Sequence, residues 1–305
     1  MMYDTIIVGA GPAGLSAGLY AARGSLKVII LEKDGIGGQI ATATKVDNYP
    51  GAPAHTTGPG LSERMREQCV ELGVEFSKKT YLSNKETDEG FQVQTNEGIL
   101  KAKTMIIATG RASKSTGYKG ERELTGMGVS YCVVCDANFF KGLKVSVIGG
   151  DDTALTEAIY LTKFAKEITI VHSQDQLEVD EMLRNKIINC PLIKVLNNTE
   201  LEEIKGNGMV ESILVKNRTT EAISEIPMDG VFIFVGQNPD TEVFVGNLQR
   251  NAKGFLVTDE EMRTNIPGLF VAGDVREKSL RQVITATADG AIAGVNAIKY
   301  IEEQE

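Results

Sequence analysis

Residues 5–14 read Thr-Ile-Ile-Val-Gly-Ala-Gly-Pro-Ala-Gly, an uncharged strand-like stretch that runs directly into a glycine-rich turn. Gly9 allows the chain to turn tightly, and Gly11 lets the backbone approach a pyrophosphate group. Gly14 permits close packing of the following helix on the strand. That helix offers free N–H groups and a positive dipole end to the phosphates. The stretch therefore predicts the opening of a βαβ unit that binds a dinucleotide.

The residues after this turn complete the unit. A helix is expected through Ala22, followed by a strand over residues 27–31, with Glu32 directly after it. An acid at the end of the second strand is placed to accept hydrogen bonds from the adenosine ribose of a dinucleotide. The continuous apolar strands are typical of parallel strands that are buried on both faces.

The same pattern occurs a second time. Residues 144–148 are a strand sequence, and residues 149–154 read Gly-Gly-Asp-Asp-Thr-Ala. A helix is expected from there to about Lys166, with a strand over residues 168–171 after it. Two such openings predict an α/β fold with two Rossmann-like, three-layer nucleotide-binding domains.

Length and charge exclude some classes of function. The chain has 305 residues, and its 32 Lys+Arg against 41 Asp+Glu give a net charge of -9. Binding to nucleic acid or to an anionic membrane is not expected, because both need clustered positive charge. Residues 5–22 are uncharged, but they contain glycines and a proline, and no basic stretch precedes them. We therefore expect a cytoplasmic protein without a signal peptide or membrane segment.

Two of the four cysteines form a pair. Cys132 and Cys135 are separated by two valines and followed by Asp136. Two thiols at this spacing can form a disulfide that carries two electrons. The alternatives are an inert structural pair and half of a zinc site. Zinc would need two more ligands, and the remaining cysteines and histidines, at positions 69, 190, 55 and 172, are not paired in sequence, so no metal site is expected.

Further motifs extend along the chain. They are Gly-Gly-Gln at 37–39, Asn-Tyr-Pro-Gly at 48–51, Met-Ile-Ile-Ala-Thr-Gly at 105–110, Gly-Leu-Phe-Val-Ala-Gly-Asp at 268–274 and Arg-Gln-Val at 281–283. With the two glycine turns, they make the chain resemble the low-molecular-weight thioredoxin reductases over essentially its whole length. The cysteine pair just before the second βαβ unit fits this resemblance. Lipoamide and glutathione reductases instead carry their pair after the first glycine turn.

The resemblance implies a flavoprotein that binds FAD and forms a homodimer. Residues 1–113 and 241–305 would form the FAD-binding domain. Residues 114–240 would form an NAD(P)H-like domain inserted between them, which carries the cysteine pair. In the family, the equivalent of Asp274 binds the ribityl chain of FAD, and the stretch around Gln282 and Val283 lies near the isoalloxazine ring. The implied FAD-contact residues are Gly9, Gly11, Pro12, Ala13, Gly14, Glu32, Lys33, Gly38, Gln39, Asn48, Ala108, Thr109, Gly110, Gly273, Asp274, Arg281, Gln282 and Val283.

The resemblance also implies catalytic roles around the pair. Cys135 would face the flavin, and Cys132 would attack the disulfide of thioredoxin after the inserted domain rotates. Asp136 would be the proton donor, provided that its surroundings raise its pKa toward neutrality.

The second glycine turn departs from the family pattern Gly-x-Gly-x-x-Ala. Asp151 stands in place of the middle glycine and would bring a side chain and a negative charge against a pyrophosphate. The family also carries His-Arg-Arg-x-x-x-Arg after the next strand, where its arginines hold the 2′-phosphate of NADPH. Here residues 172–178 read His-Ser-Gln-Asp-Gln-Leu-Glu. The loss of three charged contacts predicts an NADPH affinity that is lower by on the order of 10³.

A redox pair without a nicotinamide site resembles the ferredoxin-dependent flavin thioredoxin reductases. Flavin can accept the single electrons that reduced ferredoxin delivers. We therefore expect electrons to pass from ferredoxin through FAD and the cysteine pair to thioredoxin. Ferredoxins are acidic, so docking on this acidic chain would need a local basic patch. The candidate residues are Arg111, Lys114, Lys119, Arg122, Arg276, Lys278 and Arg281.

Three other functions are open. A conventional NAD(P)H-dependent thioredoxin reductase would lose its flavin absorbance on addition of NADPH. A two-flavin disulfide oxidoreductase would hold about two flavins per chain. A redox-sensing protein would hold FAD and a disulfide without reducing thioredoxin.

Overall fold

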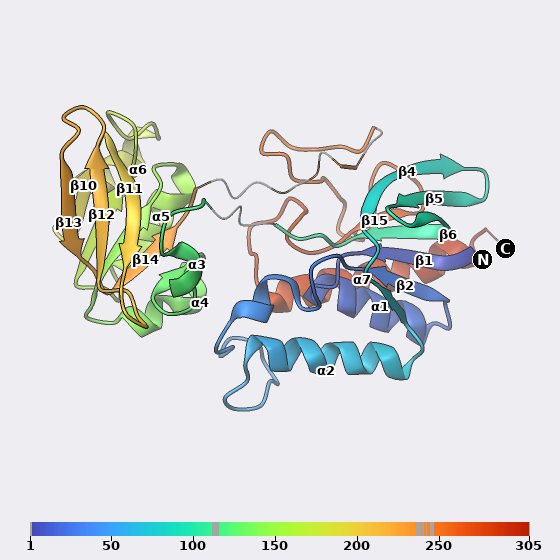
Figure 1. Ribbon diagram of the computed structural model, residues 1–305. Helices are drawn as coiled ribbons and strands as arrows, with labels where there is room; N and C mark the ends of the chain where they lie inside the picture. Colours follow the sequence, from blue (N-terminus) through green and yellow to red (C-terminus); the bar gives the residue numbers. More distant parts are fainter. Residues whose placement is uncertain are drawn as a thin grey trace. The chain divides into compact units, whose positions relative to one another are not determined.

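The chain divides into two compact units (Figure 1). One unit comprises Met1–Ala112 and Asn238–Glu305, and the other comprises Ser113–Gln237. The computed structural model describes residues 2–111, 116–235, 239, 241, 243–244 and 247–304. The domain boundaries expected at residues 113–114 and 240–241 lie partly outside these described residues.

The first unit is built on one large sheet with the strand order β3-β2-β1-β6-β5-β4, in which β15 also pairs with β6. Strands β3, β2, β1 and β15 run parallel to their neighbours, whereas β4, β5 and the start of β6 form an antiparallel meander. The elements are β1 (Met2–Val8), α1 (Pro12–Arg23), β2 (Val28–Leu31), the 3-10 helix η1 (Gly38–Thr42), α2 (Gly58–Glu71), β3 (Glu75–Ser77), β4 (Tyr81–Thr87), β5 (Gly90–Thr95), β6 (Gly98–Ile107), β15 (Leu269–Val271) and α7 (Val283–Glu302).

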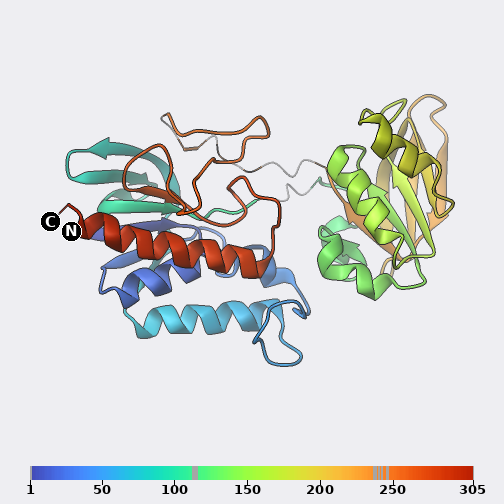
Figure 2. The same ribbon diagram turned by 180° about the vertical axis from the view of Figure 1, so that it is seen from behind.

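Successive side chains of the strands point to opposite faces of the sheet, so the core of this unit has two layers, one on each face. Ile7 and its neighbours on one face pack against Leu15 of α1 and Ala293 of α7. Ile6 and its neighbours on the other face pack against the meander, including Phe91. Successive strand residues point to opposite faces, so one apolar strand can supply both layers. Helices α1, α2 and α7 accordingly lie on one face of the sheet and the meander on the other (Figures 1 and 2).

The second unit has a parallel sheet of order β10-β9-β8-β14-β7 and a separate antiparallel sheet of order β11-β12-β13. Its elements are α3 (Glu121–Leu124), β7 (Val129–Ser130), α4 (Val133–Asp136), the 3-10 helix η2 (Ala137–Phe140), β8 (Lys144–Ile148), α5 (Asp152–Leu161), β9 (Glu167–Val171), α6 (Glu181–Ile188), β10 (Ile193–Leu196), β11 (Thr199–Lys205), β12 (Ser212–Asn217), β13 (Ile223–Pro227) and β14 (Gly230–Ile233).

The parallel sheet of this unit is covered by helices on one face and by the antiparallel sheet on the other. Val147 packs with Leu155 of α5 on the helix face. Ile148 packs with Ile213 of β12 on the opposite face. The predicted α/β class with two Rossmann-like, three-layer folds is therefore confirmed, with antiparallel strands as the third layer of each unit.

One helix is shorter than the sequence predicts. Helix α5 ends at Leu161, whereas the pattern of residues predicts a helix to about Lys166. The chain tightens there, because the amides of Thr162 and Lys163 donate to carbonyls only three residues back.

The described helices include none that is both long and apolar enough to cross a membrane. The longest of them, α7, has 20 residues and carries Asp289 and Lys299.

Candidate functional site

The first glycine turn has a backbone that excludes side chains. Gly9 has a φ of +106°, and a Cβ placed on it would lie 2.4 Å from the carbonyl oxygen of Ala108. A Cβ on Gly14 would lie 1.9 Å from the carbonyl oxygen of Gly9. The turn therefore brings α1 against β1 as closely as the sequence motif predicts.

The N-terminus of α1 is open to a ligand. Gly11 is the N-cap and supplies no side-chain hydrogen bond, and the first turn contains no acidic residue. A Cβ on Gly11 would meet nothing nearer than the Cα of Gly38, at 3.9 Å. The uncapped N–H groups and the free space beside them fit a phosphate group.

Glu32 ties the end of β2 to this turn. One carboxylate oxygen accepts the N–H of Ala10 at 2.9 Å, and the other accepts the N–H of Asp34 at 2.9 Å. The acid therefore lies beside the glycine turn, as expected. In the protein alone, its carboxylate links this turn to the loop that follows β2. Remaining lone pairs of the carboxylate can still accept hydroxyl groups.

Asp274 follows β15 and has one carboxylate oxygen that differs from the rest of the predicted cofactor site. Its Oδ1 is buried and has no hydrogen bond among the described residues. Burial raises the pKa of this carboxyl, whereas Lys278, Arg111 and Arg281 lower it. A buried acceptor without a donor is costly, so the site fits a ligand that brings hydroxyl groups. This is the chemistry that the sugar-alcohol chain of FAD would supply.

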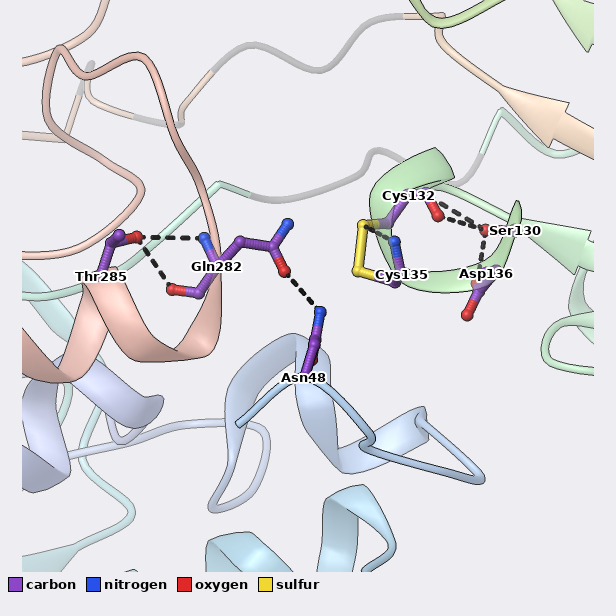
Figure 3. The surroundings of a disulfide bond; sticks show 7 residues. All are labelled: Asn48, Ser130, Cys132, Cys135, Asp136, Gln282 and Thr285. Atoms are coloured by element: carbon purple, nitrogen blue, oxygen red, sulfur yellow. Dashed lines mark hydrogen bonds between the residues drawn. A yellow bond between two sulfur atoms is a disulfide. The ribbon is translucent and has the colours of Figure 1, made fainter. Parts of the chain in front are cut away.

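The Arg281-Gln282-Val283 segment begins helix α7. Gln282 is the N-cap, and its backbone N–H donates to the hydroxyl of Thr285 at 3.1 Å. Asn48 donates from Nδ2 to Oε1 of Gln282 at 3.0 Å (Figure 3). The guanidinium of Arg281 lies over the ring of Phe255, 4.1 Å from its centroid. These contacts hold the predicted flavin-facing segment in one conformation.

The remaining predicted cofactor residues lie on the same unit. Pro12 and Ala13 form the first turn of α1, whereas Lys33 is exposed and lies 4.0 Å from Asp34. Gln39 donates to the carbonyl of Arg111. The residues that follow β6 in this set are Ala108, Thr109 and Gly110.

These residues converge because of the sheet topology. Strands β2, β1, β6 and β15 are neighbours and run parallel, so their carboxyl ends meet at one edge of the sheet. Each predicted segment follows one of these ends or begins a helix after it. Ligands of open α/β sheets bind at such an edge.

Cys132 and Cys135 form a disulfide in the second unit, with their Cα atoms 5.3 Å apart. Cys132 is the N-cap of α4, and the N–H of Cys135 lies 3.2 Å from its sulfur (Figure 3). Cys135 is exposed and Cys132 is half-buried. When the pair is reduced, this N–H can stabilise a thiolate at Cys132 and thereby lower the pKa of that thiol.

Asp136 lies next to this pair and is half-buried. Burial raises the pKa of its carboxyl, and a hydrogen bond from the hydroxyl of Ser130 lowers it. The two oxygens are 2.6 Å apart. The same hydroxyl accepts the N–H of Cys132 at 3.1 Å. Sequence reasoning missed Ser130, because only the fold shows that the end of β7 returns to the acid six residues later.

The second glycine turn is built differently from the first. Oδ1 of Asp151 accepts the N–H of Ala154 at 2.8 Å and caps helix α5. Asp152 adds a second acid in the first turn. A Cβ on Gly150 would lie 3.0 Å from the Cβ of His172. The side chain of His172 is buried, and its Nε2 is hydrogen-bonded to Oδ1 of Asn197 at 2.7 Å. The helix end that would receive a pyrophosphate therefore already has a carboxylate.

Several of the basic residues proposed for docking have other partners. Arg276 and Lys278 contact the buried Asp289, at 3.2 and 2.7 Å. Lys119 lies 2.9 Å from Glu203. Arg122 is exposed, and Lys114 lies outside the described residues.

Known proteins are similar to this chain over almost its whole length. The family model of the pyridine nucleotide-disulphide oxidoreductases matches residues 3–290. A thioredoxin reductase from Peptoclostridium litorale is 47% identical over 99% of this chain and 98% of its own. The crystal structure of thioredoxin reductase from Streptococcus pyogenes is 42% identical, with a TM-score of 0.94 over 99% of both chains.

A solved structure of a protein named after ferredoxin is also similar. A ferredoxin-flavin thioredoxin reductase from Clostridium acetobutylicum is 30% identical, with a TM-score of 0.55 over 100% of this chain and 99% of that chain. The family match covers both units and confirms the expected cofactor. The chain therefore belongs to the pyridine nucleotide-disulphide oxidoreductase family, as a flavoprotein disulfide oxidoreductase with FAD as its cofactor.

Proposed function

We propose that the chain reduces the disulfide of thioredoxin through Cys132 and Cys135, with electrons that reach FAD from reduced ferredoxin. The observation that carries the first part is the disulfide itself, which lies beside a half-buried acid and an N–H group aimed at the sulfur of Cys132. FAD, when bound, would supply the two electrons that, together with two protons, convert this disulfide into two thiols.

The cysteines then pass these electrons on by thiol–disulfide exchange. The thiolate of Cys132 attacks one sulfur of the thioredoxin disulfide, forms a mixed disulfide and displaces the other sulfur as a thiolate. Cys135 next attacks the sulfur of Cys132, which restores the pair and releases thioredoxin as a dithiol. Asp136 would give a proton to a leaving thiolate, and its partial burial, which raises the pKa of the carboxyl, supports this role.

The FAD site in this proposal comprises the predicted residues of the first unit. The N–H groups at the start of α1 would hold the pyrophosphate, and Glu32 would hold the adenosine ribose. Asp274 would accept hydroxyl groups of the ribityl chain. The FAD-binding domain then comprises residues 1–113 and 241–305, and residues 114–240 carry the redox pair. By resemblance, we also infer a homodimer.

The choice of electron donor depends on the second glycine turn. The carboxylate of Asp151 caps α5, and Asp152 lies in the next turn, so negative charge already occupies the end of the helix dipole. The segment that carries arginines in NADPH enzymes, residues 172–178, has none here. These features disfavour NADPH and support ferredoxin.

A conventional NAD(P)H-dependent thioredoxin reductase is the second candidate. A specific observation favours it: relatives named simply thioredoxin reductase match almost the whole chain at 41 to 47% identity. The parallel sheet and helix of the second unit are also intact.

An anaerobic titration of the purified flavoprotein distinguishes the two donors. The flavin band at about 450 nm is followed during addition of NADPH, NADH and then reduced ferredoxin. We expect only ferredoxin to bleach it. Rapid bleaching by micromolar NADPH would establish the conventional enzyme. Failure of the reduced protein to reduce thioredoxin would instead remove the proposed substrate.

A further inference from the structure

A buried carboxylate on α7, Asp289, has no part in the mechanism above. It is 6% exposed and is the only charged residue in the sequence between Val283 and Ile298. Its Oδ2 accepts from Nζ of Lys278 at 2.7 Å and from the N–H of Gly273 at 3.1 Å. Its Oδ1 accepts from Nη1 of Arg276 at 3.2 Å. All three donors belong to one short segment, residues 273–278.

This carboxylate forms ion pairs with two cations whose side chains are largely buried. The side chains of Lys278 and Arg276 are only 8% and 15% exposed. Charges removed from water in this way need a close opposite charge, and removal of one partner leaves the other uncompensated. Asp289 is therefore what allows this segment to fold inward with both of its cations.

The carboxylate is also held on a rigid element. Helix α7 packs against α1 so closely that a Cβ on Gly290, the residue after Asp289, would lie 2.1 Å from the carbonyl oxygen of Ala13. Segment 273–278 is thus fixed at three points to a helix that cannot shift without disturbing α1. Asp274, with its unpartnered Oδ1, lies within that segment.

We propose that Asp289 is a positioning residue for the FAD site, which fixes segment 273–278 on α7 and thereby orients the carboxylate of Asp274 toward the hydroxyl groups of the cofactor. This inference rests on the proposed role of Asp274. It assigns Arg276 and Lys278 to the same structure, and so removes them from the candidate docking patch for ferredoxin.

The test measures the rate of FAD release from the purified holoenzyme. Asp289→Asn keeps the size of the side chain but removes the carboxylate charge that contacts both cations. We expect FAD to dissociate roughly tenfold faster or more, the effect of losing a charged hydrogen bond. In the Asp274→Asn background, Asp289→Asn should accelerate FAD release little, because Asp289 acts through the carboxylate of Asp274. A merely structural role would instead accelerate release by the same factor in both backgrounds.

Matched variants separate the possible failures. In Lys278→Met/Asp289→Asn the buried ammonium is absent, so FAD retention should return toward that of Lys278→Met alone. If Asp274→Asn releases FAD at the wild-type rate, the proposed role of Asp274 is wrong. If Asp274→Asn releases FAD quickly while Asp289→Asn behaves like the wild type, the positioning role is overturned. Should Asp289→Asn yield no folded holoenzyme, Lys278→Met decides, because it removes one of the three contacts of Asp289 with the segment: faster release of FAD than in the wild type supports the role, and a wild-type rate rejects it.

Discussion

The hydroxyl of Ser130 controls the acid beside the redox pair. It donates to Asp136 at 2.6 Å, which favours the charged carboxylate and opposes the rise in pKa that burial causes. Ser130→Ala removes only the lowering effect, so the pKa of Asp136 should rise further. A proton donor works in its protonated form, which is lost as pH rises through the pKa. The decline of thioredoxin reduction on the alkaline side should therefore move to higher pH.

This shift is measured as the pH dependence of thioredoxin reduction by the pre-reduced protein in a single turnover. Asp136→Asn is the matched control, since it should abolish that limb of the profile and slow the reaction roughly 100-fold. A profile for Ser130→Ala that coincides with the wild type, or moves to lower pH, would contradict the proposed role of Asp136 as proton donor.

The two cysteines should behave differently when each is replaced. The N–H of Cys135 lies 3.2 Å from the sulfur of Cys132, which favours a thiolate at Cys132 and makes it the attacking sulfur. Cys135→Ser should therefore trap a mixed disulfide with thioredoxin, visible on a non-reducing gel. Cys132→Ser should trap little or none. Trapping by Cys132→Ser alone would reverse the assignment.

Helix α5 shows how one residue can stabilise an element while it removes a ligand site. The carboxylate of Asp151 satisfies the N–H of Ala154 at 2.8 Å. Asp151→Ala should lower the free energy of unfolding of the second unit by about 1 kcal/mol, the usual effect of losing an N-cap. FAD content should not change, because the predicted cofactor residues belong to the other unit.

Chemical denaturation followed by circular dichroism measures this loss. Asp152→Ala is the matched control: Asp152 lies in the first turn of the same helix without capping it, so only a weaker interaction with the helix dipole is removed. An equal or larger loss of stability in the control would show that Asp151 does not act as a cap.

The elements that the sequence predicts best are those whose signal is local. The turn at Gly9 and the strands on both sides of it follow from backbone sterics and continuous apolar runs, and the observed β1 and β2 end at Val8 and Leu31 as expected. The antiparallel strands β11, β12 and β13 were not predicted. β12 and β13 do not alternate regularly between buried and exposed residues, although β11 does, and strand pairing depends on tertiary contacts that no short window contains.

At the scale of the whole molecule, the sequence predicts which residues matter better than it predicts their partners. Asp274 and the cysteine pair were identified from motifs. Asp289 was not, although a lone acid within a long uncharged stretch was a usable signal. Lys278 was read as surface charge, because only the folded chain brings it to a buried carboxylate eleven residues away. Charge in a sequence does not reveal whether it faces water.

The distribution of charge on the chain also predicts how the rate of electron transfer from an acidic donor depends on salt. The chain has a net charge of -9, and Arg276, Lys278 and Lys119 have acidic partners of their own. Encounter with an acidic ferredoxin is then opposed by like charge, and salt screens that repulsion. The rate of flavin reduction by ferredoxin should stay level or increase as ionic strength rises to about 0.15 M, where the screening length is about 8 Å. Stopped-flow absorbance measures this rate.

Arg122→Gln replaces an exposed arginine and should change the rate of flavin reduction little. A steep fall with salt, together with slower reduction of that variant, would instead locate a basic docking patch around Arg122, since only attraction between opposite charges is weakened by screening.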